Sequence, residues 1–532
     1  MLAAGASLAS APGPAIVTAM KVQLVKLLIL LAAASSVTGA THQADTSGIA
    51  WFKGELTEAF AAARSTHKPI LLYWGASWCP PCQQLQSTVF SRADFIGKSR
   101  AFVAVYLDGD DSGAQKWGEE FKVVGYPTLL VLDADRRELM RIASSMDLGL
   151  YATVLDTALA DLQPAGELLV AATQGRALDI GQCRRLAYNG WVLDDLQAAE
   201  QAPRAQQLIA AAAHCPGSAR VERARLLIDA ASLLGQAEGE ALKAGGSPSA
   251  SLRVQVALIG AILGDKRLAL TVADALQYLD EGFFRAVKAD RGASDWVRRF
   301  IGVMDAAAVD PDFAEADQLG AVASKLIAIK TIEGSIPAGA ARAARARVDA
   351  AMAGKQIPYI RSGLINATLG VFDALGQNEQ AYQVVQAELG HTATPYYYEA
   401  DLGELAEGLG RTSEALQWYA RSYRDSRGAA TRFQWGVRYV VGILKLTPED
   451  GGRIRTVTAE VLGELDGPDR IYRRARMRLE RLDRALRDWN ESSKGAHRDV
   501  LAALRNRLQE LCVKIPAREP AHASCDAFLA GT

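Results

Sequence analysis

The sequence predicts a small α/β domain near the N-terminus, followed by a large all-helical region. Residues 46–162 alternate short apolar runs with helical patterns, and a Cys-Pro-Pro-Cys motif follows the first of these runs. From residue 163 onward, helical patterns rich in Ala, Leu, Arg and Glu follow one another without a strand pattern. The element order of 46–162 is typical of an α/β domain, and a chain of 532 residues exceeds the usual size of one core.

The elements of residues 46–162 are predicted from their apolar patterns, in the order β-α-β-α-β after a leading helix. Continuous apolar runs are typical of buried central strands. They predict strands at 70–76, at 101–108 and at the start of 128–139, where an Asp-rich turn follows. Helical spacing, or a proline at the first helical position, predicts helices at 55–67, 79–90, 114–123 and 147–162.

The first 40 residues are predicted to be an upstream extension and a signal peptide, with Met20 as the start. Lys21 and Lys26 supply positive charge, 27–34 form a short apolar stretch, and small residues end at Ala40. The apolar stretch is short for a spanning helix, and an uncleaved membrane anchor is the alternative. A cleaved signal predicts that the mature chain works in a bacterial periplasm.

The charge of the chain gives no reason to expect nucleic acid as a partner. The formal net charge is −1, so no overall electrostatic attraction to phosphate exists. The arginine-rich segment 473–489 places an apolar stripe on one face and its arginines on the other, mixed with acidic residues. We therefore interpret the arginine face as a solvated helix surface. The stripe consists of Ala475, Leu479, Leu482, Leu486 and Trp489.

The chain has six cysteines, and an even number in an oxidising compartment suggests pairing. The simplest arrangement is three local pairs, although the connectivity of the last four cysteines stays open. These pairs are Cys79–Cys82, Cys183–Cys215 and Cys512–Cys525. No second Cys-x-x-Cys with matching histidines supports a zinc site. Neither a metal nor another cofactor is therefore predicted.

Two segments of the helical region repeat at an offset of 34 residues. "LGQNEQAYQ" (375–383) and "LGRTSEALQ" (409–417) share Leu, Gly, Ala and Gln, and 263–270 has the same Leu-Gly and Ala spacing. A glycine at the turn and a small alanine at the crossing suit a helical hairpin. These features resemble tetratricopeptide repeats, so a TPR-like array that binds protein partners is predicted over 163–532. Other helical-hairpin arrays remain possible.

The pattern places Cys79 at the N-terminus of a helix, with Cys82 one turn further along. Unpaired backbone N–H groups and the helix dipole favour a thiolate there. We expect an exposed Cys79 that attacks a disulfide and a covered Cys82 that resolves the mixed disulfide. Pro80 and Pro81 bring no charge, and Pro81 lacks an N–H, so the pair is predicted to be comparatively reducing. A purely structural disulfide is the alternative, but so small a ring adds little stability.

Two stretches resemble the thioredoxin fold: "KPILLYWGASWCPPCQQLQ" and, further along, "GYPTLLVLD". The Lys68-Pro69 lead-in and the segment "SRADFIGKSRAFVAVYLDGDD" (91–111) resemble the subgroup that includes the C-terminal domain of the bacterial periplasmic disulfide reductase. The resemblance implies that Cys79 is the nucleophile and Cys82 the resolving thiol. It also implies that Trp78 flanks the site and that Tyr126-Pro127, joined by a cis bond, forms the loop that binds the substrate backbone.

Two positions depart from the pattern of that family. Many thioredoxins have a buried acid where this chain has Tyr73, and Ala104 falls near the place of the lysine that pairs with the acid. Without that acid, water or a carboxylate such as Asp108 would have to help deprotonate Cys82. Exchange is then expected to be slower, or limited to one favoured partner.

Together these observations predict a periplasmic thiol–disulfide oxidoreductase of reducing character. Its expected partners are proteins with cysteines or disulfides, and a separate redox protein that recycles the pair. No nucleic acid is expected, and a membrane is expected only through an uncleaved signal anchor. Two alternatives stay open. One is a disulfide isomerase or oxidase, and the other is a binding or assembly protein in which the thioredoxin-like domain is accessory.

Overall fold

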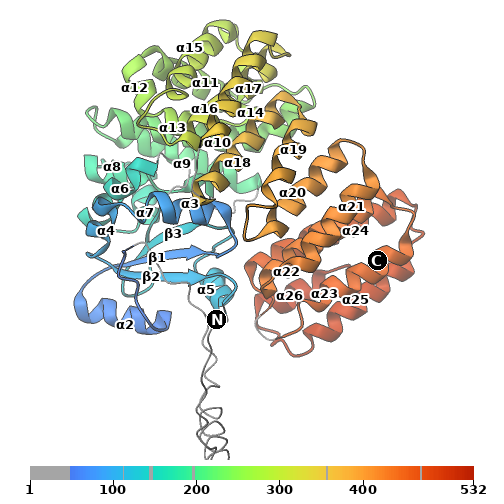
Figure 1. The fold of residues 1–532 in the computed structure, drawn as a ribbon. Coiled ribbons are helices and arrows are strands. Elements are labelled where there is room, and N and C mark those ends of the chain that lie inside the picture. Colours follow the sequence, from blue (N-terminus) through green and yellow to red (C-terminus); the bar gives the residue numbers. More distant parts are fainter. Residues whose placement is uncertain are drawn as a thin grey trace, which may run out of the picture. The chain divides into compact units, whose positions relative to one another are not determined.

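The described part of this computed structural model runs from residue 48 to 531, except for 112, 143–147, 194–197, 355–357 and 468–469. The predicted signal segment and Met20 lie outside the described residues. From Ser47 onward the elements form one packed unit, so the N-terminal α/β part and the helical part are in direct contact. Figure 1 shows the sheet at the N-terminal end of this unit.

The apolar run at 70–75 forms the central strand of a four-stranded sheet with the order β2-β1-β3-β4. β1 pairs in parallel with β2 and antiparallel with β3, which pairs antiparallel with β4. The strands are β1 (Ile70–Gly75), β2 (Val103–Asp108), β3 (Thr128–Leu132) and β4 (Glu138–Ile142). The fourth strand was not predicted, because its sequence "ELMRI" follows the turn directly and is too short to show a clear pattern.

Both faces of the sheet are buried, which explains the continuous apolar character of β1. Leu71 and Tyr73 point into one core, and Ile70, Leu72 and Trp74 point into the other. Helices α3, α4 and α6 contribute to the first core, and α2 and α5 flank the second. Their bounds are α2 (Leu56–Thr66), α3 (Pro80–Thr88), α4 (Ala93–Ser99), α5 (Ala114–Glu120) and α6 (Tyr151–Ala160), with a short η1 at Leu148–Leu150.

The described residues after α6 are helical, apart from a single bridge between Ile142 and Asn189. The first helices of this part are α7 (Ala165–Thr173), α8 (Ile180–Ala187), η2 (Trp191–Leu193), α9 (Ala198–His214), α10 (Arg220–Lys243), α11 (Ala250–Gly264), α12 (Lys266–Thr271), α13 (Ala273–Leu276), α14 (Glu281–Lys288), α15 (Ala293–Ala307), α16 (Glu315–Glu333) and α17 (Ala338–Ala353). The remaining helices are α18 (Pro358–Leu375), α19 (Asn378–Glu388), α20 (Pro395–Gly408), α21 (Thr412–Asp425), α22 (Ala429–Leu446), α23 (Gly451–Gly463), α24 (Arg473–Ser492), α25 (Arg498–Cys512) and α26 (Pro520–Ala527). Among the helices of the described chain, none is both long and apolar enough to cross a membrane.

The two repeated segments form helical hairpins, as their sequence predicted. Gly376 and Gly410 end α18 and α20 with φ values of 67° and 73°, a left-handed conformation that glycine adopts without strain. Ala381 and Ala415 are 2% and 0% exposed in the second helix of each hairpin. The related segment at 263–270 turns differently, because Asp265 caps α12 in place of a left-handed glycine.

Arg185 of α8 ties the helical part to the end of the α/β part. Its side chain is fully buried and its guanidinium donates to the carbonyls of Thr157, Ala158 and Gln163 at 3.0–3.1 Å. These carbonyls lie at and just beyond the C-terminus of α6, where a helix leaves acceptors without intrahelical partners. One cation therefore satisfies the end of α6 and fixes α8 against it.

The arginine face of α24 is not the solvated surface that the sequence predicted. The predicted apolar stripe is buried, with Ala475 the most exposed of its members at 7%. Arg474 on the next face is also buried, however, and Arg476 pairs with Glu119 of α5. The prediction was wrong at these positions because α5 comes from the N-terminal α/β part, 357 residues away in sequence.

Replacing Arg185 with methionine is expected to lower the free energy of unfolding by about 3 kcal/mol, because three buried carbonyls lose a charged donor. Arg298→Met in α15 is the control. Arg298 and its partner Asp295 are both exposed, so the loss of this ion pair should cost less than about 1 kcal/mol. Urea unfolding followed by circular dichroism compares the two. Equal losses would contradict the role of Arg185.

Candidate redox site

The redox pair lies where β1 ends and α3 begins. β1 stops at Gly75, and Cys79 is the N-cap residue of α3 with an extended backbone. Pro80 and Pro81 occupy the first helical positions, where a missing N–H costs no intrahelical hydrogen bond. The backbone N–H of Cys82 donates to Cys79 Sγ at 3.2 Å. The sulfur of Cys79 therefore occupies the place that a capping oxygen takes in other helices.

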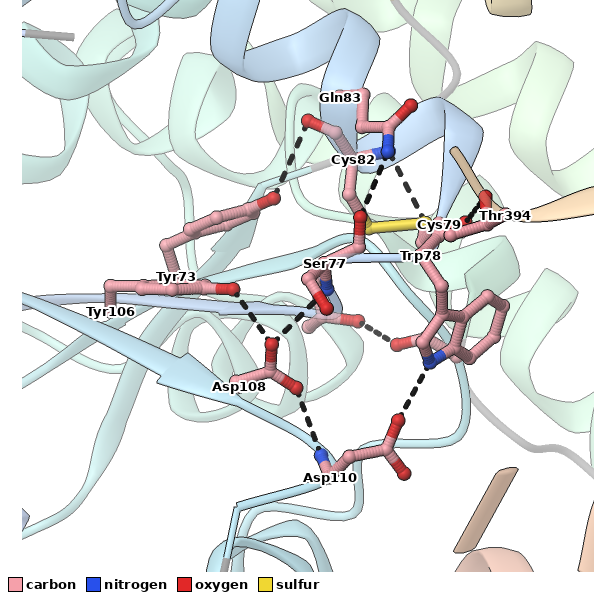
Figure 2. The surroundings of a disulfide bond; sticks show 12 residues. Tyr73, Ser77, Trp78, Cys79, Cys82, Gln83, Tyr106, Asp108, Asp110 and Thr394 are labelled. Carbon is pink, nitrogen blue, oxygen red and sulfur yellow. Dashed lines mark hydrogen bonds between the residues drawn. A yellow bond between two sulfur atoms is a disulfide. The ribbon is translucent and has the colours of Figure 1, made fainter. Parts of the chain in front are cut away.

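Cys79 and Cys82 are joined by a disulfide, with their Cα atoms 5.2 Å apart (Figure 2). The expectation of an exposed attacking cysteine was wrong for this state of the molecule. Cys79 is 3% exposed, nearly as covered as Cys82 at 0%. Residues of the helical part contact Trp78, which directly precedes Cys79, and the sequence alone did not place them there.

Tyr126 and Pro127 precede β3 and are joined by a cis bond. The ring of Tyr126 packs edge-on against Trp78, with 5.8 Å between ring centroids, and stacks beside Trp74. Its hydroxyl accepts a hydrogen bond from Gln115 at 3.1 Å. Burial raises the pKa of Tyr126. The predicted loop therefore lies beside the predicted flanking tryptophan.

Of the two positions that depart from the thioredoxin pattern and the carboxylate suggested in their place, Tyr73 contacts the backbone of Cys82, whereas Asp108 bonds to Ser77 and Tyr106. The Tyr73 hydroxyl donates to the Cys82 carbonyl at 3.5 Å, so it meets the backbone of the resolving cysteine (Figure 2). Asp108 ends β2 and accepts from Ser77 N–H at 3.1 Å and from the Tyr106 hydroxyl at 3.2 Å. Asp108 thus fixes the loop before Cys79 through the backbone of Ser77.

Asp110 is a site residue that the sequence analysis missed. Its carboxylate accepts from Trp78 Nε1 at 2.6 Å, as Figure 2 shows, and its backbone N–H donates to Asp108. It also accepts from the hydroxyl of Thr431 at 2.7 Å and 2.9 Å. Burial raises the pKa of Asp110, while the hydrogen bonds from Thr431 and Trp78 oppose that rise. An acidic loop, "DGDD", was the only signal in the sequence for this residue.

Residues of the helical part surround Trp78. The Thr394 hydroxyl donates to the Trp78 carbonyl at 3.3 Å. The rings of Tyr397 and Trp435 lie 6.3 Å and 6.2 Å from the Trp78 ring. The Arg474 guanidinium stands 4.0 Å from the centroid of the Tyr126 ring, a cation–π contact. None of these residues carried a sequence signal, because their partners lie hundreds of positions away.

The other four cysteines form disulfides far from the redox pair in sequence. Cys183 of α8 is joined to Cys215 after α9, and Cys512 of α25 to Cys525 of α26. These are the local pairs that the sequence analysis favoured. Each one links two consecutive helices of the helical part. All four cysteines are buried, at 6% exposure or less.

Comparisons with known proteins agree with the geometry of the N-terminal part. Residues 56–159 match the model of the thioredoxin-like domain family. Over 100 residues the chain is 26% identical to the disulfide bond reductase DsbH of Chlamydia pneumoniae. That match covers 16% of this chain and 58% of the relative, so the chain spans less than two thirds of the relative's length. The N-terminal part of the chain is a thioredoxin-like domain, and a large all-helical region follows it.

Proposed function

We propose that this chain is a thiol–disulfide oxidoreductase that reduces disulfides in protein partners through Cys79 and Cys82. The observation that carries the proposal is the position of the pair: Cys79 caps α3 with its sulfur at the helix N-terminus, one turn before Cys82. A helix N-terminus favours a thiolate, and the thiolate is the nucleophile in disulfide exchange. The similarity to a protein named as a disulfide bond reductase supports the same chemistry.

The reaction begins with the reduced pair. The Cys79 thiol loses its proton and attacks one sulfur of a substrate disulfide, and the other substrate sulfur leaves as a thiolate and takes up a proton. Cys82 then loses its proton and attacks Cys79 Sγ, which releases the second substrate sulfur as a thiolate that is protonated in turn. Two electrons have passed from the pair to the substrate. A dithiol of a partner protein must restore the pair.

The residues between the cysteines favour a reducing pair. A more stable thiolate stabilises the reduced form and makes a pair more oxidising. Pro80 and Pro81 carry no charge, and Pro81 offers no N–H to a Cys79 thiolate. The amide of Cys82 remains as a donor to the sulfur. A reductase is therefore favoured over an oxidase or an isomerase.

The location and the partners belong to the same proposal. The signal-like segment before residue 41 and the two disulfides outside the redox pair support an oxidising compartment outside the cytoplasm, such as a bacterial periplasm. The hairpins of α18–α21 resemble repeats that bind other proteins, which supports partners that are themselves proteins.

The Cys82→Ala variant of the full chain is expected to hold substrates as mixed disulfides on Cys79, because no second thiol is present to release them. Covalent adducts are recovered from the native compartment after acid quenching and separated on non-reducing gels. Cys79→Ser is the matched control and should recover none of the same adducts. Equal recovery from both variants, or none from Cys82→Ala, would contradict the proposed exchange.

Replacing Pro81 with histidine is expected to raise the reduction potential of the pair by about 30 mV or more, because a cationic side chain and a restored N–H both stabilise the Cys79 thiolate. Pro81→Ala restores the N–H alone, so its potential should lie between those of the histidine variant and the parent chain. Equilibration against glutathione measures all three. An unchanged or lower potential in Pro81→His would show that the two prolines do not set the reducing character.

A further inference from the structure

The face of the redox pair is closed by segments of the same chain that lie more than 300 residues downstream. Thr394 donates to the Trp78 carbonyl across a separation of 316 residues, and Thr431 donates to Asp110 across 321 residues. Trp78 is 6% exposed and Cys79 is 3% exposed under these contacts. A protein disulfide has to reach Cys79 Sγ, and a residue that is 3% exposed offers it little surface.

One carboxylate connects the redox motif to this cover. Asp110 accepts from Trp78, which precedes Cys79, and from Thr431 in the first turn of α22. Gly428 is the N-cap residue of α22 and has φ +81°, and a side chain at this position would overlap the Asp110 carboxylate. The N-terminus of α22 therefore lies against Asp110, where the helix dipole favours a negative charge.

Polar contacts at two further points hold the cover in place. Arg474 of α24 stands over the Tyr126 ring, and Arg476 donates to Glu119 of α5 at 2.9 Å. The cover is thus made by the start of α20, the start of α22 and the start of α24. By contrast, α18 packs along α3 itself. α22 and α24 make hydrogen bonds, ring contacts and an ion pair with the N-terminal α/β part, and Trp435 also belongs to the apolar core that holds Trp78 and Cys79.

We propose that the starts of α20, α22 and α24 form a gate over the redox pair, and that the Asp110 contacts with Trp78 and Thr431 are its latch. The closed state excludes protein disulfides from Cys79, and a partner gains access when the latch opens. This inference rests on the proposed function, because it describes how that exchange is controlled. The occupant of the closed site is the chain itself, through Thr394, Tyr397 and Trp435.

Two variants in the helical part should open the gate, and neither substitutes a residue of the thioredoxin-like domain. Gly428→Ala places a methyl group against the Asp110 carboxylate. Thr431→Val keeps the shape of the side chain and removes the hydroxyl that donates to Asp110. The controls are Gly376→Ala, which also has a positive φ but has open space around it, and Thr456→Val, whose hydroxyl bonds to its own helix.

The readout is the size dependence of thiol modification in the full chain after reduction and removal of the reductant. N-ethylmaleimide and a maleimide on a protein-sized polyethylene glycol share one reactive group, and peptide mass spectrometry follows Cys79. For each chain, the rate of Cys79 modification by the large reagent is divided by the rate with the small reagent, once in the folded state and once in urea. In the parent chain this rate ratio should be about tenfold lower in the folded state than in urea, because only the open fraction admits the large reagent. Gly428→Ala and Thr431→Val should each reduce that difference severalfold, and the two controls should not.

The gate would be overturned if the ratio of the large-reagent rate to the small-reagent rate in the parent chain were the same in the folded state and in urea. Latch variants that change the ratio no more than their controls would overturn the role of Asp110 in holding it. The proposed function is tested separately by the mixed disulfides of Cys82→Ala. A gate that opens in the latch variants while no mixed disulfide forms would support the gate and refute the oxidoreductase.

Discussion

The position of Cys79 between the end of β1 and the first turn of α3 is the constraint on which the site depends. A buried central strand carries the chain to one edge of the sheet, and the helix that follows must begin with unpaired N–H groups. Cys79 fills the capping position, so its sulfur receives the Cys82 amide. The two prolines are tolerated there because the first helical positions need no intrahelical donor. The chemistry of the pair thus follows from a strand-to-helix junction.

The rest of the molecule is arranged around this junction. Asp108 and Asp110 follow β2, the neighbour of β1, so their side chains reach the loop before Cys79 and the indole of Trp78. The same loop then meets the N-terminus of α22, and the apolar core on the α3 face of the sheet continues into the helices from α18 onward. The helical region is therefore joined to the redox site directly, and it contacts Trp78, which precedes the attacking cysteine.

How much of this could be predicted from the sequence depends on the distance between partners along the chain. The three strands with long apolar runs, the Cys-Pro-Pro-Cys helix and the two hairpins with left-handed glycines have local patterns, and the structure confirms these elements. The contacts of Thr394, Thr431 and Arg474 have no local pattern, because each becomes meaningful only when the helical part folds onto the sheet. The same reason explains the errors at Cys79, expected to be exposed, and at the arginine face of α24, expected to be solvated.

The reduction potential of the Cys79–Cys82 pair in the full chain tests the central chemistry most directly. Equilibration against dithiothreitol or glutathione gives the value, with the other four cysteines followed separately by peptide mass spectrometry. A reversible potential near that of thioredoxin, about −270 mV, is expected for a pair separated by two prolines. A value between about −120 and −180 mV would make the pair an oxidant or an isomerase, and a pair that does not titrate reversibly would contradict its use in exchange.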